Sequence, residues 1–371
     1  MTKSKKLLLI IGLSYAVAIA GLATTNLLHN FFGINGVAEQ RVDDDPFANF
    51  EESTPTSSAK TSTPSSSGSG SVTSNESEPA ISSETTVTVS PYTETTTVFT
   101  RYNPNEYDPN NECHDSRDNP IIFYTLEIKI KKITDLRTNQ VTDSNGYPGD
   151  NCLSTVYNQI KDVEKKYNVQ VLGAISGDSS YNNLDHRLGY VLRNGQVLRT
   201  QARTGNDSVF EDLVLWNDGT MSLYTEPGFT GTRRTPSLPT YTTNDLTNGR
   251  AWQVWTFGPT LIYNGAICVD EDEDVASPHQ AGNQRTAIGY LGPFHYMFLV
   301  SQGRNRGQTD GFSLHDLAQR LYDRGCTLAY NLDGGDSSTF YYWDETSNSA
   351  KKYPTQKTPR ALGDMIYVVD A

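Results

Sequence analysis

Residues 328–342 read LAYNLDGGDSSTFYY, which places a polar loop directly after a buried strand. The apolar run at 326–332 is typical of a strand covered on both faces. Gly334 and Gly335 let the backbone turn sharply and let a ligand come close. Successive N–H groups in such a turn can form an anion-binding nest, which suits a phosphate or a sugar. A tight turn whose side chains bond their own backbone is the alternative. The loop's acidic and hydroxyl side chains are Asp333, Asp336, Ser337, Ser338 and Thr339.

The tetrapeptide GDSS occurs a second time, at 177–180, after the apolar strand-like run VQVLGAIS. Each copy follows a helical pattern and then a strand pattern, but the surroundings differ and no fixed-period repeat is present. The two loops are therefore predicted to lie at the same edge of one sheet. Gly177 and Asp178 would then form one wall of a pocket, and the loop at 333–339 the other.

Strand and hairpin patterns dominate the chain after residue 120. IIFYTLEIKIKKI at 121–133 alternates as a strand does, and DMIYVVD at 364–370 is typical of a last strand. Two-residue hairpin turns need positive φ angles, which Asn-Gly and Asp-Gly supply. Three such hairpins are predicted, at Asn194-Gly195, Asp218-Gly219 and Asn264-Gly265.

Two helices are predicted, and neither belongs to a regular βαβ alternation. The first lies within 152–167, where the apolar residues at helical spacing are Leu153, Val156, Tyr157, Ile160 and Val163. The second is capped by Ser313, with Asp316 at position N3, and Gly325 closes it. The pattern predicts an α+β fold, a single globular domain on a mixed or largely antiparallel sheet with a few helices.

The N-terminal third has a different character. Three lysines precede an uncharged apolar run at 7–28, which is long enough to span a bilayer. The flanking positive charge predicts a single-pass cell-membrane protein with its C-terminal domain extracellular. A cleaved signal peptide is the alternative. The following Ser/Thr/Pro-rich stretch is typical of a disordered stalk. The predicted division is 1–30 anchor, 31–117 linker and 118–371 globular domain.

The net charge limits the binding partners of the protein, and the cysteines bear on its disulfides and metal sites. The net charge of −13 argues against nucleic acid or an anionic membrane surface as the main partner. The cysteines, Cys113, Cys152, Cys268 and Cys326, permit two disulfides in an exported chain, and at least one is predicted. They form no C-x-x-C motif, so no zinc site is predicted. The acidic run DEDED at 270–274 lacks EF-hand spacing and is typical of a solvated loop; calcium binding is the alternative. No other cofactor is predicted.

Several sequence blocks resemble the phosphodiester glycosidase family, in that family's order. They cover the chain from about residue 120 to its end and are RTAIG at 285–289, QGR at 302–304, GFSLHDLA at 311–318 and NLDGGDSST at 331–339, with AISGD at 174–178 upstream and RALGDMIYV at 360–368 at the close. Asp336 departs from the family pattern, which has a glycine there. Gln302 stands where the family block begins with Asp.

The resemblance implies a glycosidase that hydrolyses a GlcNAc-like sugar-1-phosphodiester between the anomeric carbon and phosphate. The substrate would be cell-surface or extracellular polysaccharide, as for the bacterial, exopolysaccharide-associated branch. Carboxylates stabilise the oxocarbenium-like sugar, attack it or activate water, and cations hold the phosphate. The catalytic residues that this implies are Asp333, Asp178 and Asp336. The substrate-binding residues are Arg285, Arg304, Asn331, Gly334, Gly335, Ser337, Ser338, Thr339 and Gly177.

Two other functions remain open from the sequence. One is a non-catalytic protein that binds or assembles cell-wall material or exopolysaccharide. The other is a metal-dependent phosphodiesterase that cuts the P–O bond rather than the C–O bond.

Overall fold

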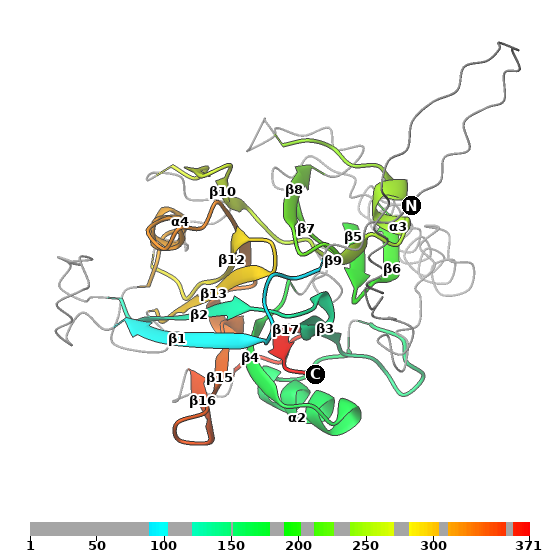
Figure 1. The fold of residues 1–371 in the computed structure, drawn as a ribbon, viewed down its shortest axis with the longest axis horizontal. Helices are drawn as coiled ribbons and strands as arrows, with labels where there is room; N and C mark the ends of the chain where they lie inside the picture. The colour runs from blue at the N-terminus through cyan, green and yellow to red at the C-terminus, as the bar shows by residue number, and fades with distance from the viewer. Residues whose placement is uncertain are drawn as a thin grey trace, which may run out of the picture.

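The computed structural model describes residues 89–102, 121–149, 151–178, 189–201, 211–225, 238–270, 282–303, 311–353 and 359–371. Within these ranges the chain forms three sheets, and all strand neighbours within the sheets are antiparallel (Figure 1). A few short helices lie outside them. The predicted α+β fold with a largely antiparallel sheet is therefore confirmed.

The largest sheet has seven strands in the order β1-β2-β13-β12-β14-β10-β11. Its strands are β1 (Thr96–Tyr102), β2 (Phe123–Lys129), β10 (Thr260–Tyr263), β11 (Ala266–Ile267), β12 (Thr286–Gly292), β13 (His295–Ser301) and β14 (Leu328–Leu332). Thr286 pairs with Val300 on one side and with Leu332 on the other. The start of β12 therefore lies between the ends of β13 and β14.

Two five-stranded sheets complete the fold. The second sheet has the order β16-β15-β4-β17-β3, with β3 at Leu136–Gln140, β4 at Val171–Ser176, β15 at Phe340–Asp344, β16 at Ser349–Tyr353 and β17 at Asp364–Val369. The third sheet has the order β6-β5-β9-β7-β8, with β5 at Gly189–Arg193, β6 at Gln196–Gln201, β7 at Glu211–Trp216, β8 at Met221–Thr225 and β9 at Ala251–Trp255.

One hydrophobic core joins the three sheets. It contains Leu126 and Ile288 from the first sheet, Ile175 and Ile366 from the second, and Trp252 from the third. All five side chains are almost fully buried. Because burial of apolar surface is the main force that holds sheets together, this shared core fixes the strand ends of different sheets relative to one another.

The two predicted helices are present. Helix α2 (Val156–Tyr167) is capped by Thr155 and packs beside β4 and β17, and α4 (Leu314–Tyr322) packs beside β10 (Figure 1). Ser313 and Asp316 form the predicted capping box of α4. The prediction for Leu153 was wrong, because this residue precedes the helix and is 46% exposed. A five-residue helix, α3 (Thr243–Thr247), was not predicted.

The predicted hairpins are also present. Asn194 and Gly195 both have positive φ, as do Asn264 and Gly265. In the Asp218-Gly219 hairpin only Gly219 has positive φ. Its turn is one residue longer than predicted, with the Trp216 N–H donating to the Thr220 carbonyl. This is the arrangement of a longer hairpin loop that ends in a left-handed residue.

Strand β1 contradicts part of the predicted linker, since it lies within 31–117. It pairs with β2 along seven residues, and Phe99 stacks on Tyr342 of β15 with ring centroids 3.9 Å apart. The β-branched and aromatic residues of TTVFTRY suit an edge strand, which outweighs the Thr-rich composition around them. The predicted anchor at 7–28 lies outside the described residues, and no helix among those that are described is both long and apolar enough to cross a membrane.

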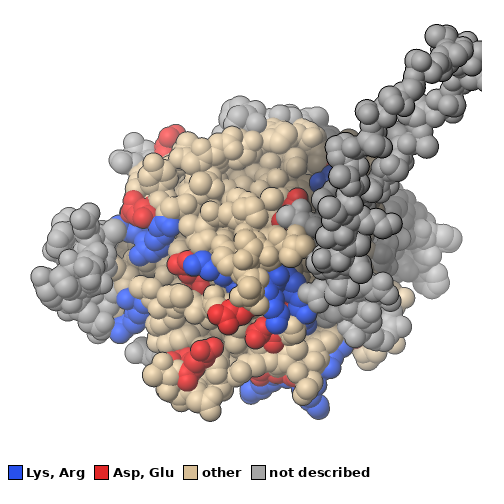
Figure 2. All heavy atoms as spheres, viewed as in Figure 1, with Lys and Arg blue, Asp and Glu red and all other residues tan. Residues whose placement is uncertain are grey.

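Charged side chains of both signs are intermingled on the face that β1 and β2 present (Figure 2). Two ion pairs on these and nearby elements join Lys129 to Glu127, at 3.2 Å, and Lys131 to Asp370, at 2.8 Å. The described part of this face therefore shows no broad surface of a single charge.

Candidate functional site

The two GDSS loops meet where the ends of β4 and β14 approach the start of β12. The Asp333 N–H donates to the Gly177 carbonyl at 3.1 Å. The Ser176 hydroxyl donates to the Asp333 carbonyl at 3.0 Å. The predicted contact between the two loops is therefore confirmed for their described residues; residues 179–188 lie outside that set. The prediction that both loops lie at the edge of one sheet was wrong, because β14 belongs to the first sheet and β4 to the second.

The Asp333 carboxylate is held in one orientation close to the surface. The Ser337 hydroxyl donates to Oδ2 at 2.7 Å, and Nη2 of Arg360 donates to both carboxylate oxygens, at 3.3 and 3.2 Å. The Asp333 side chain is 10% exposed and that of Arg360 is 57% exposed. From the sequence, Arg360 could equally be explained as part of an ion pair that pins the last strand. In the structure, Arg360 forms its ion pair with Asp333, which is the first of the predicted catalytic residues.

The glycine-rich loop is a tight turn, and this corrects one prediction. Residues Gly335–Ser337 form the 3-10 turn η3. The N–H groups of Gly335, Ser337 and Ser338 donate to backbone carbonyls of the protein, at 2.9, 3.0 and 3.2 Å. These three groups do not form the predicted anion nest. A Cβ on Gly334 would lie 2.9 Å from the Gln284 carbonyl, so this glycine allows the loop to pack on the chain entering β12.

Buried hydroxyl groups form hydrogen bonds that hold the loop at 333–339. The Thr286 hydroxyl lies 3.1 Å from that of Ser176 and donates to that of Ser338 at 3.2 Å. Thr339 donates to the Ser337 carbonyl at 3.0 Å. Ser338 and Thr339, which the sequence suggested as substrate contacts, are almost fully buried. Their observed hydrogen bonds therefore hold the loop.

Asp178 lies in a buried charged cluster just behind the loops. Its Oδ1 accepts from Nη2 of Arg193 at 2.7 Å, and its Oδ2 accepts from the Thr256 N–H at 2.7 Å. The same Nη2 reaches Oδ2 of Asp364 at 3.3 Å, which also accepts from the Asp178 N–H at 3.2 Å. All three side chains are at most 1% exposed. These hydrogen bonds tie the end of β4 to β5 and β17.

The remaining predicted contacts lie in different environments. Arg285 is buried, and its Nε donates to the Phe312 carbonyl at 3.0 Å. Asn331 donates through Nδ2 to the Gly258 carbonyl at 2.7 Å. Its Oδ1 has no hydrogen-bond partner within the described residues, even though Asn331 is buried, with only 5% of the residue exposed. Asp336 is exposed, and Arg304 lies outside the described residues.

Gln302, where the family block has Asp, connects two strands. Its N–H donates to the Ile122 carbonyl at 2.8 Å, and its Nε2 donates to the Tyr124 hydroxyl at 2.5 Å. Burial raises the pKa of the Tyr124 phenol to about 12, so the phenol stays neutral at physiological pH. Gln302 therefore joins the end of β13 to β2, which is a structural reason for an amide side chain at this position.

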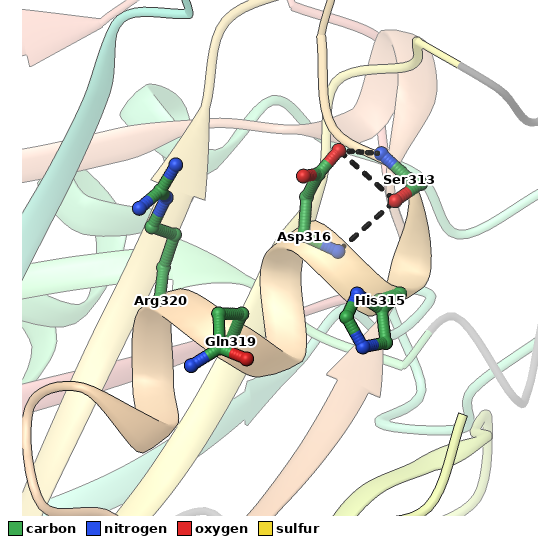
Figure 3. Close-up of a pocket in the computed structure, with 5 residues that line it drawn as sticks. All are labelled: Ser313, His315, Asp316, Gln319 and Arg320. Atoms are coloured by element: carbon green, nitrogen blue, oxygen red, sulfur yellow. Dashed lines mark hydrogen bonds between the residues drawn. The ribbon is translucent and has the colours of Figure 1, made fainter. Parts of the chain in front are cut away.

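A separate hollow of about 440 Å³ lies over the first turns of α4 (Figure 3). It is lined by Ser313, His315, Asp316, Gln319 and Arg320. Ser313 and Asp316 are bound to each other in the helix cap, as the dashed lines in Figure 3 show. The hollow contains none of the predicted catalytic residues, so it is not the candidate site.

The calcium alternative and the predicted disulfide both depend on residues that the structure does not describe. Among the described residues no group of three or more metal-binding side chains comes together, and most of the acidic run at 270–274 lies outside them. Cys268 and Cys326 carry free thiols. Cys113 is not among the residues described, and the predicted disulfide stays a prediction.

Comparison with known proteins identifies the family. The family model described as phosphodiester glycosidase matches residues 165–369, more than half of the chain, and the chain belongs to this family. The resemblance predicted from the sequence blocks is thereby confirmed. No curated protein sequence matches this chain.

Solved structures are similar to this chain in fold. One is the catalytic domain of zebrafish N-acetylglucosamine-1-phosphodiester alpha-N-acetylglucosaminidase, auto-inhibited by its pro-peptide, with 16% identity over 76% of this chain and 86% of that chain and a TM-score of 0.51. Weaker likenesses are a hypothetical protein from Synechocystis (14% identity, 68% of this chain, 60% of that chain, TM-score 0.41) and a putative exported protein from Burkholderia pseudomallei K96243 (13%, 68%, 74%, 0.38). At these identities the zebrafish structure supports the fold alone.

Proposed function

We propose that this protein hydrolyses the bond between the anomeric carbon and phosphate in a GlcNAc-like sugar-1-phosphodiester. Its family membership supports a glycosidase acting on such a bond. One observation carries the proposal: the Asp333 carboxylate is held near the surface by Ser337 and Arg360, where two family blocks meet. The proposed substrate is part of a cell-surface or extracellular polysaccharide, which the Lys-flanked apolar run and the Ser/Thr-rich stretch of the sequence favour.

The proposed chemistry assigns different tasks to the three carboxylates. The sugar becomes oxocarbenium-like as the bond to phosphate breaks, and a carboxylate beside C1 stabilises it, attacks it or activates water. Asp333 has the fixed orientation for this task, and its side chain, which is 10% exposed, adjoins the exposed guanidinium of Arg360. Asp336, exposed on the same turn, is the second candidate. Asp178 is fully buried, so it contributes by positioning the loops.

Substrate binding is proposed for the surrounding residues. The buried Oδ1 of Asn331 is an acceptor that a sugar hydroxyl or amide N–H can satisfy, and leaving such a group unsatisfied is costly. A Cβ on Gly335 would meet no atom within 4 Å, so this glycine leaves room for the sugar to approach the backbone. Arg285 and Arg304 are the phosphate-binding candidates that the family resemblance implies.

The test is to incubate the purified full-length protein with a GlcNAc-1-phosphodiester and to measure released sugar, with Asp333→Asn alongside. Release by the wild type but not by the variant, at equal melting temperature, supports the proposal. Heavy-oxygen water adds a second readout, since C–O cleavage places the label on the sugar and P–O cleavage places it on the phosphate. Label on the phosphate would contradict a glycosidase.

The second candidate function is non-catalytic binding of cell-wall material or exopolysaccharide. The observation that favours it is Asp336, a charged and exposed residue where the family has glycine. No sugar release across a panel of sugar phosphodiesters, with polysaccharide binding retained, would support this function instead.

A further inference from the structure

We propose that Arg360 also binds the phosphate of the substrate, through the edge of its guanidinium that faces away from Asp333. The inference rests on the proposed function and deepens it. It assigns the phosphate to a residue that neither the sequence blocks nor the comparisons place in that role.

The guanidinium of Arg360 is divided between the protein and the surface. Its Nε donates to the Ser337 hydroxyl at 3.0 Å, and its Nη2 donates to the Asp333 carboxylate and to Ser337. Its Nη1 has no hydrogen-bond partner among the residues that the structure describes, and the side chain is 57% exposed. The two N–H groups of Nη1 are therefore available to an anion.

The backbone around Arg360 holds this guanidinium in place. The Arg360 N–H donates to the Asp336 carbonyl at 3.2 Å. Two residues later, Leu362 exchanges two backbone hydrogen bonds with Ser154, at 2.8 and 2.9 Å. A cation that is already ordered before the substrate arrives loses little entropy on binding, which favours recognition and catalysis.

Arg285, which is the described one of the two arginines predicted to bind phosphate, is less suited to binding it than Arg360 is. Arg285 is 7% exposed, and its Nε is used by the Phe312 carbonyl. The planar fork of Arg360 instead reaches solvent while it touches Asp333. A phosphate on the Nη1 edge and a carboxylate on the Nη2 edge would lie side by side on one rigid group. This arrangement places the bond between phosphate and C1 next to the carboxylate.

The reaction step balances with water as the only co-reactant. The bond from C1 to the bridging phosphate oxygen breaks, and its electron pair leaves with that oxygen. Water adds its oxygen to C1 and releases one proton, which leaves a free sugar and a phosphate monoester. Negative charge grows on the phosphate during this step, and charge-assisted hydrogen bonds from Arg360 stabilise it.

The test compares two substrates that share the sugar but differ in the leaving group. One is the GlcNAc-1-phosphodiester and the other is an uncharged aryl glycoside of GlcNAc. Arg360→Ala should lower kcat/KM for the phosphodiester about 10- to 100-fold more than for the aryl glycoside. Arg360→Lys, which keeps the charge but loses the fork, should fall between the two. Arg250→Ala, an exposed arginine that contacts the Trp216 ring instead, is the matched control and should leave both rates unchanged.

Equal losses on both substrates would show that Arg360 acts only through Asp333, and would overturn the inference. Calorimetric binding of GlcNAc 1-phosphate separates this failure from failure of the proposed function. If the wild type hydrolyses neither substrate but binds the sugar phosphate at least about 10-fold more tightly than Arg360→Ala does, the proposed function fails and the phosphate site stands. If the folded Arg360→Ala protein binds the sugar phosphate as the wild type does, the phosphate site fails.

Discussion

Replacing Gly177 with alanine tests whether packing requires the glycine of the first GDSS loop. A Cβ there would lie 2.3 to 2.5 Å from three atoms of the Asp364 carboxylate. That carboxylate is buried and accepts hydrogen bonds from Arg193 and from the Asp178 N–H, so it cannot withdraw without breaking them. Overpacking costs about 1–3 kcal/mol, and a lost hydrogen bond to a charged group adds about 1.5–3 kcal/mol. We therefore expect G177A to lose about 4 kcal/mol, a fall in melting temperature of about 10 °C.

The assay is thermal unfolding followed by circular dichroism. Gly149→Ala is the control, because its nearest contact would be Cys152 Sγ at 3.8 Å, an ordinary distance. A double variant, Gly177→Ala with Asp364→Ala, should lose less stability than the sum of the single variants, since the clashing carboxylate is gone. If G177A melted at the temperature of the Gly149→Ala control, the steric reasoning would be wrong.

Three further predictions concern stability and the loop. Arg193→Met leaves two buried carboxylates without their cation and should cost about 3–5 kcal/mol in urea unfolding; a loss similar to that of an exposed arginine would contradict the cluster. Gly334→Ala should abolish most hydrolysis while the protein stays folded, since only the turn has to shift; unchanged sugar release would refute this. Burial raises the pKa of Asp135 to about 6, so the folded protein holds this proton more tightly than the unfolded chain does. As the pH rises from about 4 to about 6, the wild type should therefore lose up to about 3 kcal/mol relative to Asp135→Asn in melting experiments; a constant difference would count against it.

Local chemistry explains why much of the fold could be predicted from the sequence. Asn194-Gly195 fixes its hairpin because few other pairs accept positive φ at both positions. Ser313 and Asp316 start α4 because they satisfy N–H groups that a helix leaves open at its start. The prediction was wrong for β1, where the alternation that marks a strand is surrounded by linker-like composition and the partner strand lies beyond residue 120.

The site was only partly predictable, because its decisive contacts join distant segments. The repeated GDSS sequence predicted that Gly177 and Asp333 lie together, and the structure confirms their contact, although the strands before them belong to different sheets. No pattern in the sequence indicates that Arg193 lies against Asp364, 171 residues away, or that Arg360 lies against Asp333, 27 residues away. These pairs depend on how three sheets pack on a common core, which no local pattern specifies.

The position of β1 has a practical consequence for producing this protein. A chain that begins at residue 118, the start of the globular domain predicted from composition, would lack β1 and leave the outer edge of β2 uncovered along seven residues. An uncovered strand edge is a template on which a second molecule can pair, so such a truncation should self-associate in solution. A start before Ser90, whose hydroxyl donates to the Ile130 carbonyl at 2.6 Å, retains both the strand and the contact that leads into it.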